Sequence, residues 1–319
     1  MTLPEQHDQT PAEPSGGVGG ADGPSDTVSD TVMVAVDGSE PSDVAARYAV
    51  DICRRSGSEL AIAHVVTGYS GLVPTVVPGL EEAGQAVLDE AVTLARASLP
   101  ADRVHGYLLH GQRQAALLEL SHQARLVVLG FQQKSSVERL VTGSTITAIS
   151  SAAACPVATI PKAWAGNDRG VVGVGIKTID SAEPLLREAL RIARLRESRL
   201  EIVHSWQLPT AAYEGLLLSE IETQDWEQDM RAALEEVAAP VFADYPDVTT
   251  RIQVVESHPA LALRDLGENA DLLILARRRR AFPRGHLGGT ARAMLREAPC
   301  PVVVVPTDGQ CPGYPDGVL

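Results

Sequence analysis

Small, acidic and hydroxyl residues follow two apolar runs of this sequence, in a pattern that suits the binding of a phosphate ester. Asp37-Gly38-Ser39 comes directly after the apolar run 32–36, and Gly130 comes directly after the run 126–129. Gly143-Ser144-Thr145 then opens a stretch with helical spacing. A helix that starts with glycine and hydroxyl residues offers free backbone N–H groups and a positive dipole end, which favour an anion. These residues predict a phosphate site.

Each of these motifs also has an ordinary structural interpretation. Asp-Gly after a strand is a common turn, and Ser or Thr at a helix start is a common N-cap. His64 and His204 are lone histidines on predicted strands, so we interpret them as structural. The sequence has no Ser-His-Asp order, Walker loop or cluster of metal ligands. We therefore expect a binding protein without a catalytic cycle.

The elements that would position these motifs alternate between strand and helix. Strands are expected at 32–36, 60–66, 104–109, 126–129 and 157–160, and helices at 42–56, 82–98, 114–122 and 143–153. Apolar strands that alternate with helices predict parallel βαβ units with right-handed crossovers. In such sheets ligands bind beyond the carboxyl ends of the strands. Aromatic residues make up only 4% of the chain, so aliphatic side chains must fill a sheet buried on both faces.

An internal repeat indicates that the chain contains two copies of this unit. A shift of 140 residues aligns 32–66 with 172–206, with ten identical positions among 35 and no gap. A shift of 145 aligns Cys155-Pro156-Val157 with Cys300-Pro301-Val302. In copy two we expect strands near 171–176, 200–204, 250–255, 272–275 and 302–305, and a longer second helix at about 219–242.

The repeat predicts domain 1 at residues 31–162 and domain 2 at 170–307, each with a five-stranded sheet of its own. The flanking segments 1–30 and 308–319 are rich in glycine, proline and polar residues. They cannot bury enough apolar surface to offset the entropy of ordering, which predicts disordered tails.

Taken together, the motifs resemble those of the universal stress protein family. Asp37, His64-Val65, Gly130, Gly143-Ser144 and Cys155-Pro156-Val157 fall in register with that family's strand-one acid, strand-two pair, glycine-rich loop and fifth strand. The resemblance implies two tandem, Rossmann-like, nucleotide-binding-type α/β domains with strand order 3-2-1-4-5. It also implies that the two copies pack as a pseudo-dimer through their fifth strands.

The resemblance further implies an ATP site in domain 1, with Mg²⁺ accompanying the nucleotide. In ATP-binding members the acid and the backbone of the strand-two valine hold the adenosine, and the glycine-rich loop wraps the phosphates. Gln133 stands where that loop has its second glycine, and its side chain obstructs a close approach of backbone and phosphate. The implied site residues are Asp37, Gly38, Ser39, Val65, Gly130, Gly143, Ser144 and Thr145.

Copy two departs further from the family pattern. Lys177 replaces the acid, Ser205 replaces the valine and Ala276 replaces the strand-four glycine, although Gly288-Gly289-Thr290 remains. We therefore expect that domain 2 has lost the ATP site. The run Arg277–Arg280 has three interpretations: a solvated basic loop, an anion site shared with Lys177, or a DNA contact. The acidic chain and the lack of an aromatic platform or recognition helix make the DNA contact the weakest of the three.

Charge and cysteine content narrow the function further. A net charge of −14 disfavours nucleic acid and anionic membranes as partners. Four cysteines without paired spacing suit a reduced cytoplasm, and no apolar run reaches the roughly 18 residues of a membrane span. The resemblance then implies a cytoplasmic stress-response regulator. Two alternatives stay open: a protein with decayed pockets that binds an unidentified non-nucleotide partner, and an adenine-nucleotide hydrolase, against which no base is placed beside a nucleophile.

Overall fold

The computed structural model describes residues 30–67, 79–132, 139–166, 168–207, 220–277 and 287–306 of the 319-residue chain. Most of the two predicted tails lies outside these ranges. Asp30 is the exception, and the prediction of disorder there is wrong. Its carboxylate accepts a hydrogen bond from the Ser58 hydroxyl (3.1 Å) and pairs with the buried guanidinium of Arg125. Asp30, the residue before β1, is therefore held by contacts with two side chains.

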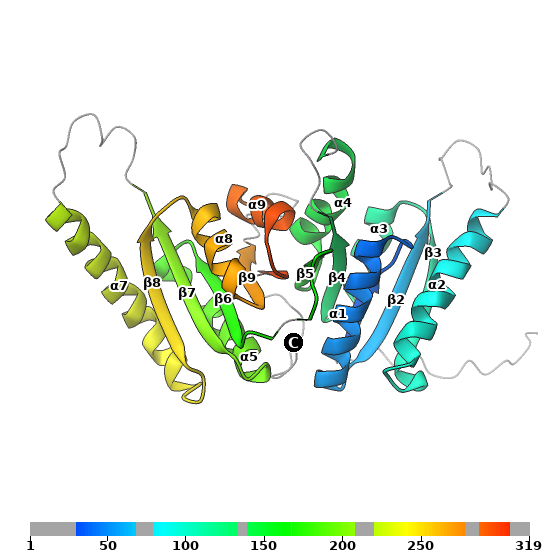
Figure 1. Ribbon diagram of the computed structural model, residues 1–319, viewed down its shortest axis with the longest axis horizontal. Coiled ribbons are helices and arrows are strands. Elements are labelled where there is room, and N and C mark those ends of the chain that lie inside the picture. The colour runs from blue at the N-terminus through cyan, green and yellow to red at the C-terminus, as the bar shows by residue number, and fades with distance from the viewer. Residues whose placement is uncertain are drawn as a thin grey trace, which may run out of the picture.

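The described residues form ten strands with helices on both faces of the sheet (Figure 1). The first half contains β1 (Thr31–Ala35), α1 (Glu40–Ser56), β2 (Glu59–Val66), α2 (Leu80–Arg96), η1 (Ala101–Arg103), β3 (Val104–His110), α3 (Arg113–Leu120), β4 (Leu126–Phe131), α4 (Arg139–Ala152) and β5 (Val157–Pro161). The second half contains β6 (Val171–Ile176), η2 (Ile179–Ser181), α5 (Glu183–Leu195), β7 (Arg199–Trp206), α7 (Glu220–Ala243), β8 (Thr250–Glu256), α8 (Pro259–Asn269), β9 (Leu272–Arg277), α9 (Gly289–Glu297) and β10 (Val302–Pro306). All ten predicted strands are present, each within two residues of its predicted bounds.

The strand order confirms the predicted topology and corrects one part of it. The order is β3-β2-β1-β4-β5-β10-β9-β6-β7-β8, so each half has the order 3-2-1-4-5 with parallel neighbours. The two halves are not separate sheets, because β5 and β10 pair antiparallel and join them into one. An unpaired edge strand would leave a row of N–H and C=O groups without partners, and this pairing satisfies both edges at once.

The junction between the halves has approximate two-fold symmetry. Ala158 pairs with Val303, with Val157–Val304 and Thr159–Val302 on either side. The repeat superposes 157 on 302 and 159 on 304, so each flanking pair is the image of the other. The pseudo-dyad therefore passes through the Ala158–Val303 pair.

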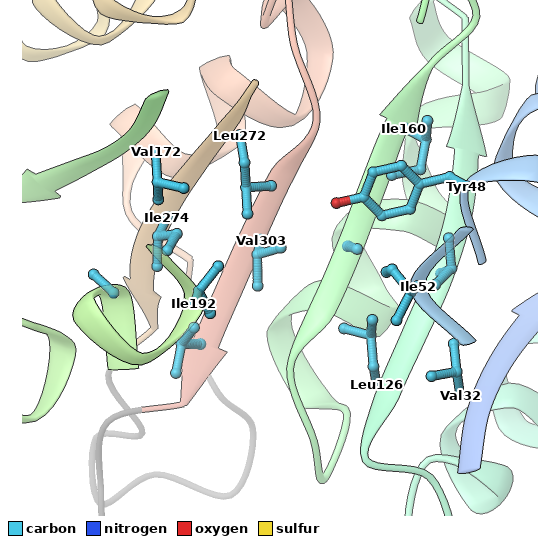
Figure 2. Close-up of a cluster of buried hydrophobic side chains, with 14 of the residues drawn as sticks. Val32, Tyr48, Ile52, Leu126, Ile160, Val172, Ile192, Leu272, Ile274 and Val303 are labelled. Atoms are coloured by element: carbon cyan, nitrogen blue, oxygen red, sulfur yellow. The ribbon is translucent and has the colours of Figure 1, made fainter. Parts of the chain in front are cut away.

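The hydrophobic core continues across this junction on one face of the sheet. The cluster under α1, α2, α5 and α7 includes buried residues of both halves, among them Ile160 of β5 and Val303 of β10. Figure 2 shows this cluster, with Tyr48 beside Ile160 in one half and Ile192 beside Val303 in the other. On the opposite face α3 and α4 cover one cluster and α8 and α9 another, and Ile146 of α4 packs against both. The two domains therefore form a single packed body.

Local sequence signals account for the ends of the first helix, which positions the predicted site. The Ser39 hydroxyl caps α1 by accepting the Ser42 N–H (3.4 Å). Gly57 ends the helix with φ 81°, a left-handed conformation that favours glycine, and its N–H returns to the Cys53 carbonyl. Between these caps the buried face carries apolar side chains at helical spacing: Val44, Ala45, Tyr48, Ala49 and Ile52.

None of the described helices is both long enough and apolar enough to cross a membrane.

Candidate functional site

Asp37 emerges at the carboxyl end of β1 in the predicted turn. The last backbone bond of that strand end runs from the Val36 N–H to the Ala63 carbonyl (2.9 Å). The Asp37 carboxylate then lies exposed, where its Oδ1 accepts the Ser39 hydroxyl (2.5 Å) and the Ser39 N–H (3.2 Å). Gly38 has φ 75°, and a Cβ there would lie 3.1 Å from Val87 of α2. The turn therefore needs glycine at 38.

The environment of Asp37 keeps its side chain ionised. Burial by itself raises the pKa of the carboxyl, but the hydrogen bonds from Ser39 and the nearby charge of Arg113 outweigh that effect and lower it from 3.8. A carboxylate accepts hydrogen bonds and repels phosphate. Asp37 therefore suits the hydroxyl-bearing part of a ligand, and a phosphate would have to lie further along the sheet edge.

The two strand histidines occupy equivalent structural positions. The ring Nδ1 of His64 lies 2.9 Å from the Val36 carbonyl oxygen, and that of His204 lies 2.9 Å from the Ile176 carbonyl oxygen. Each ring thus ties the second strand of its domain to the last residues of the first. The interpretation of both histidines as structural is confirmed.

The backbone of Val65 faces the space into which Asp37 emerges. The Ala63 carbonyl accepts from β1, and the Val66 carbonyl accepts the Gly111 N–H on the β3 side (3.2 Å). Successive residues of a strand direct their backbone groups to alternate edges, so Val65 faces β1, as Ala63 does. The ladder with β1 ends at the Ala35–Ala63 pair. The N–H and C=O of Val65 therefore lie beyond the last paired residue of β1, on the side of β2 where Asp37 follows that strand.

Gly130 is required by packing at the end of β4. A Cβ at this position would lie 2.0 Å from the carbonyl oxygen of Pro41 and 2.9 Å from the nitrogen of Ser42, both in the first turn of α1. No side chain fits between these two backbones. The glycine that the family resemblance assigns to a ligand thus has a structural reason of its own.

The start of α4 differs from the predicted helix start. This helix begins at Arg139, four residues before Gly143, so Gly143-Ser144-Thr145 does not open it. Only the first four N–H groups of a helix lack intrahelical partners, and Gly143 is the fifth residue. Arg139 and Leu140 are good helix formers, and an interior glycine costs a helix only roughly 1 kcal/mol. Gln133 lies outside the described residues.

Domain 2 has a different arrangement at the same strand ends. Lys177 is exposed where domain 1 has Asp37, and η2 follows it and packs on α7. Helix α5 begins only at Glu183, although it still contacts β9, and the exposed Ala276 stands where domain 1 needs Gly130. In this domain the glycine pair does stand at a helix start, because α9 begins at Gly289 with Gly288 as its N-cap. The two strand ends are therefore unlike in both charge and shape.

Arg277, the first residue of the arginine run, does not itself fit the interpretations given for that run. Its side chain is 2% exposed, and its Nη2 donates to the Ala153 carbonyl of domain 1 over 2.7 Å. It is neither a solvated loop residue nor part of an anion site with Lys177. Arg278–Arg280 lie outside the described residues. Sequence reasoning missed this contact, and the signal available was that Arg277 aligns with Phe131, a buried strand end.

The cysteines within the described ranges are buried and form no disulfide. Burial raises the pKa of the Cys53 and Cys300 thiols to about 12. Within the described ranges, histidine, cysteine and acidic side chains form no group of three that could hold a metal ion.

Comparisons with known proteins agree on one family. The sequence model of the universal stress protein family matches residues 29–161 and again 169–306. A universal stress protein of Mycobacterium tuberculosis is 29% identical over 287 residues, which cover 86% of this chain and 96% of that protein. The crystal structure of a universal stress protein from Archaeoglobus fulgidus shares the fold, with a TM-score of 0.64, 16% identity, and coverage of 88% of this chain and 99% of that one. A universal stress protein solved in complex with cAMP matches 36% of this chain and 86% of its own at 26% identity and a TM-score of 0.30.

Proposed function

Because this chain belongs to the universal stress protein family, we propose that domain 1 binds an adenine nucleotide at the carboxyl ends of β1, β2 and β4, and that domain 2 does not. The observation that carries the proposal is the placement of the Asp37 carboxylate and the Val65 backbone at the carboxyl ends of two neighbouring strands. The likeness to the cAMP complex is too partial to place a ligand, so the support comes from these groups.

The two groups complement different parts of an adenosine. An ionised carboxylate accepts hydrogen bonds from ribose hydroxyls, as acidic residues do in other nucleotide-binding sheets. A backbone N–H and C=O that share one edge of a strand can pair with the acceptor and donor on the edge of adenine. Asp37 and Val65 would therefore orient the nucleoside, with the base over β2 and the sugar over β1.

The phosphates would then extend from the sugar toward β4 and the start of α4. That direction takes them away from the negative charge of Asp37. A helix offers free N–H groups in its first turn, and that turn of α4 begins at Arg139 rather than at Gly143. ATP with Mg²⁺ is the form we propose, on the strength of the family resemblance.

We further propose that the protein acts by binding, without a catalytic cycle, as a cytoplasmic stress-response regulator. Buried cysteines that form no disulfide are typical of proteins in a reducing compartment. One observation favours a second function, the binding of a non-nucleotide partner: the contact with Pro41 explains Gly130 without any ligand.

Calorimetric titration of ATP with Mg²⁺ into three forms of the full chain tests the proposal. Wild type should bind, Asp37→Ala should not, and Lys177→Ala at the equivalent position of domain 2 is the matched control. Asp37→Asn keeps the turn but loses the charge, and a charged hydrogen bond of about 1.5–3 kcal/mol predicts an affinity roughly ten- to a hundredfold weaker. Loss of binding in the Lys177 variant alone would place the site in domain 2. Wild-type protein that neither binds ATP nor carries nucleotide by mass spectrometry would favour the partner-binding function.

A further inference from the structure

We infer that Arg277 of domain 2 is a positioning residue for α4 of domain 1, and that nucleotide affinity in domain 1 depends on it. The second part of this inference rests on the proposed function. The Arg277 Nη2 donates to the carbonyl oxygen of Ala153, the residue that follows the last turn of α4. A guanidinium at that end adds a charged hydrogen bond and also complements the negative end of the helix dipole. Domain 2 thus supplies a cap for a helix of domain 1.

The cap lies in a dry part of the junction, where it cannot be replaced by water. Arg277 is 98% buried, since 2% of its surface is exposed, and Ala153 is equally enclosed. Hydrogen bonds to charged groups are stronger when they are sheltered from solvent. The position of Ala153 is therefore tied to the end of β9.

Side-chain packing supports the same link between α4 and domain 2. Ile146 lies one to two turns before Ala153 and contacts the cores of both domains. Helices α4 and α9 lie against each other where the two halves meet (Figure 1). The last two turns of α4 are thus held from domain 2 by a hydrogen bond and by apolar contacts.

The pseudo-dyad does not repeat this arginine in domain 1. The pseudo-dyad relates Arg277 to Phe131, since both pair with the terminal proline of the neighbouring fifth strand, Pro306 and Pro161. Phe131 is buried but has no group that could cap α9. Domain 1 therefore has no arginine equivalent to Arg277 at this position.

The geometry of α4 makes this anchor relevant to a ligand. At 1.5 Å per residue its 14 residues span roughly 21 Å, from the loop after β4 to the domain junction. Its first turn faces the end of domain 1 where we place the phosphates, and its last turn carries the anchor. A rigid helix held at one end conveys a displacement to the other.

Hydrogen exchange of the ligand-free full chain tests the anchor itself. Arg277→Met keeps the length and apolar stem of the side chain but loses the donor, and we expect the amides of residues 146–153 to exchange about tenfold faster. Arg277→Lys keeps the charge and should restore part of the protection. Arg191→Met is the matched control, because Arg191 is 6% exposed in the same domain but pairs with Glu188 within α5.

Titration of ATP into the same proteins tests the consequence. Arg277→Met should raise the dissociation constant about twofold to thirtyfold, with partial recovery in Arg277→Lys and no change in Arg191→Met. Unchanged α4 exchange overturns the positioning role, and unchanged affinity with faster exchange overturns the link to the nucleotide. If the wild type binds no ATP, the proposed function and the link fall together, while the exchange data still decide whether Arg277 positions α4. If Arg277→Met does not fold, Ile146→Val weakens the same link, and the same two outcomes apply.

Discussion

Replacing Gly130 with alanine should destabilise domain 1 through a collision between two backbones. The new Cβ would lie 2.0 Å from the Pro41 carbonyl oxygen, 2.4 Å from its carbon and 2.9 Å from the Ser42 nitrogen. Real Cβ contacts stay above 3.0 Å, so β4 and the first turn of α1 must separate by about 1 Å. The obstacle is main chain and cannot rotate away. Relief requires movement of a helix whose inner face is packed on β4 and β5.

The size of the effect follows from that packing. Overpacking a core costs about 1–3 kcal/mol, and a main-chain obstacle on a buried helix puts this site near 3 kcal/mol. For a cooperative unit of this size, each kcal/mol lowers the melting temperature by roughly 2–4 °C, so Gly130→Ala should lower it by about 6–12 °C. The same movement would displace Ser39 and the Asp37 turn, so ATP affinity should fall as well.

Ala276→Gly is the matched control in domain 2. Six residues, 177–182, separate β6 from α5, whereas four residues, 36–39, separate β1 from α1. Ala276 is exposed, so its loss of a methyl group should cost only the roughly 0.5–1 kcal/mol of a glycine in a strand. Thermal unfolding followed by circular dichroism measures both variants. A melting temperature of Gly130→Ala within about 2 °C of wild type, or an equal drop in both variants, would refute the backbone collision. Gly130 would then need an explanation from a ligand.

Three further outcomes are expected. The Cys53 and Cys300 thiols have pKa values of about 12, so roughly one molecule in ten thousand should be ionised at pH 8. Alkylation mapped by mass spectrometry should therefore label them only after unfolding. Rapid labelling in the native protein would contradict their burial. The lowered pKa of Asp37 contributes stability that is fully present above its unfolded value near 3.8 and is lost as pH falls through the folded value. Asp37→Asn should therefore reduce the loss of stability with falling pH in this range of an acid-unfolding curve. An unchanged curve would count against a lowered pKa of Asp37. Gln133→Gly should strengthen ATP binding about tenfold if the side chain obstructs the loop, and an equal or weaker dissociation constant would show that Gln133 is not the defect.

The sequence was sufficient for the fold because its signals are local and repeated. Apolar runs separated by helical spacing located every strand, and ten shared identities between 32–66 and 172–206 showed that the unit occurs twice. The end of α1 at Ser56 was predicted correctly, because Gly57 gives one strong signal, whereas its start lies two residues before the predicted residue 42. The start of α4 failed because two local signals competed there: Gly143-Ser144 suits a helix start, but the preceding Arg139 and Leu140 extend the helix.

For the candidate site, too, some features could be predicted from the sequence and others depend on the tertiary structure. The residue types and their order at the strand ends could be read from the sequence, together with the loss of the acid at Lys177. Which backbone groups face the opening depends on strand register, and the need for glycine at 130 depends on how closely α1 crosses β4. Neither is encoded in residues that lie near each other in the chain.

By itself, then, the sequence determined two parallel α/β units with acidic and hydroxyl residues at the first strand end of domain 1, because period and composition act over a few residues. Only the tertiary structure decided that β5 and β10 join the units into one sheet, and that Arg277 crosses the junction to Ala153. Both are contacts between residues more than 120 positions apart, since 124 separate the last pair. Their formation depends on edge hydrogen bonds and buried charge that exist only once the two domains have packed together.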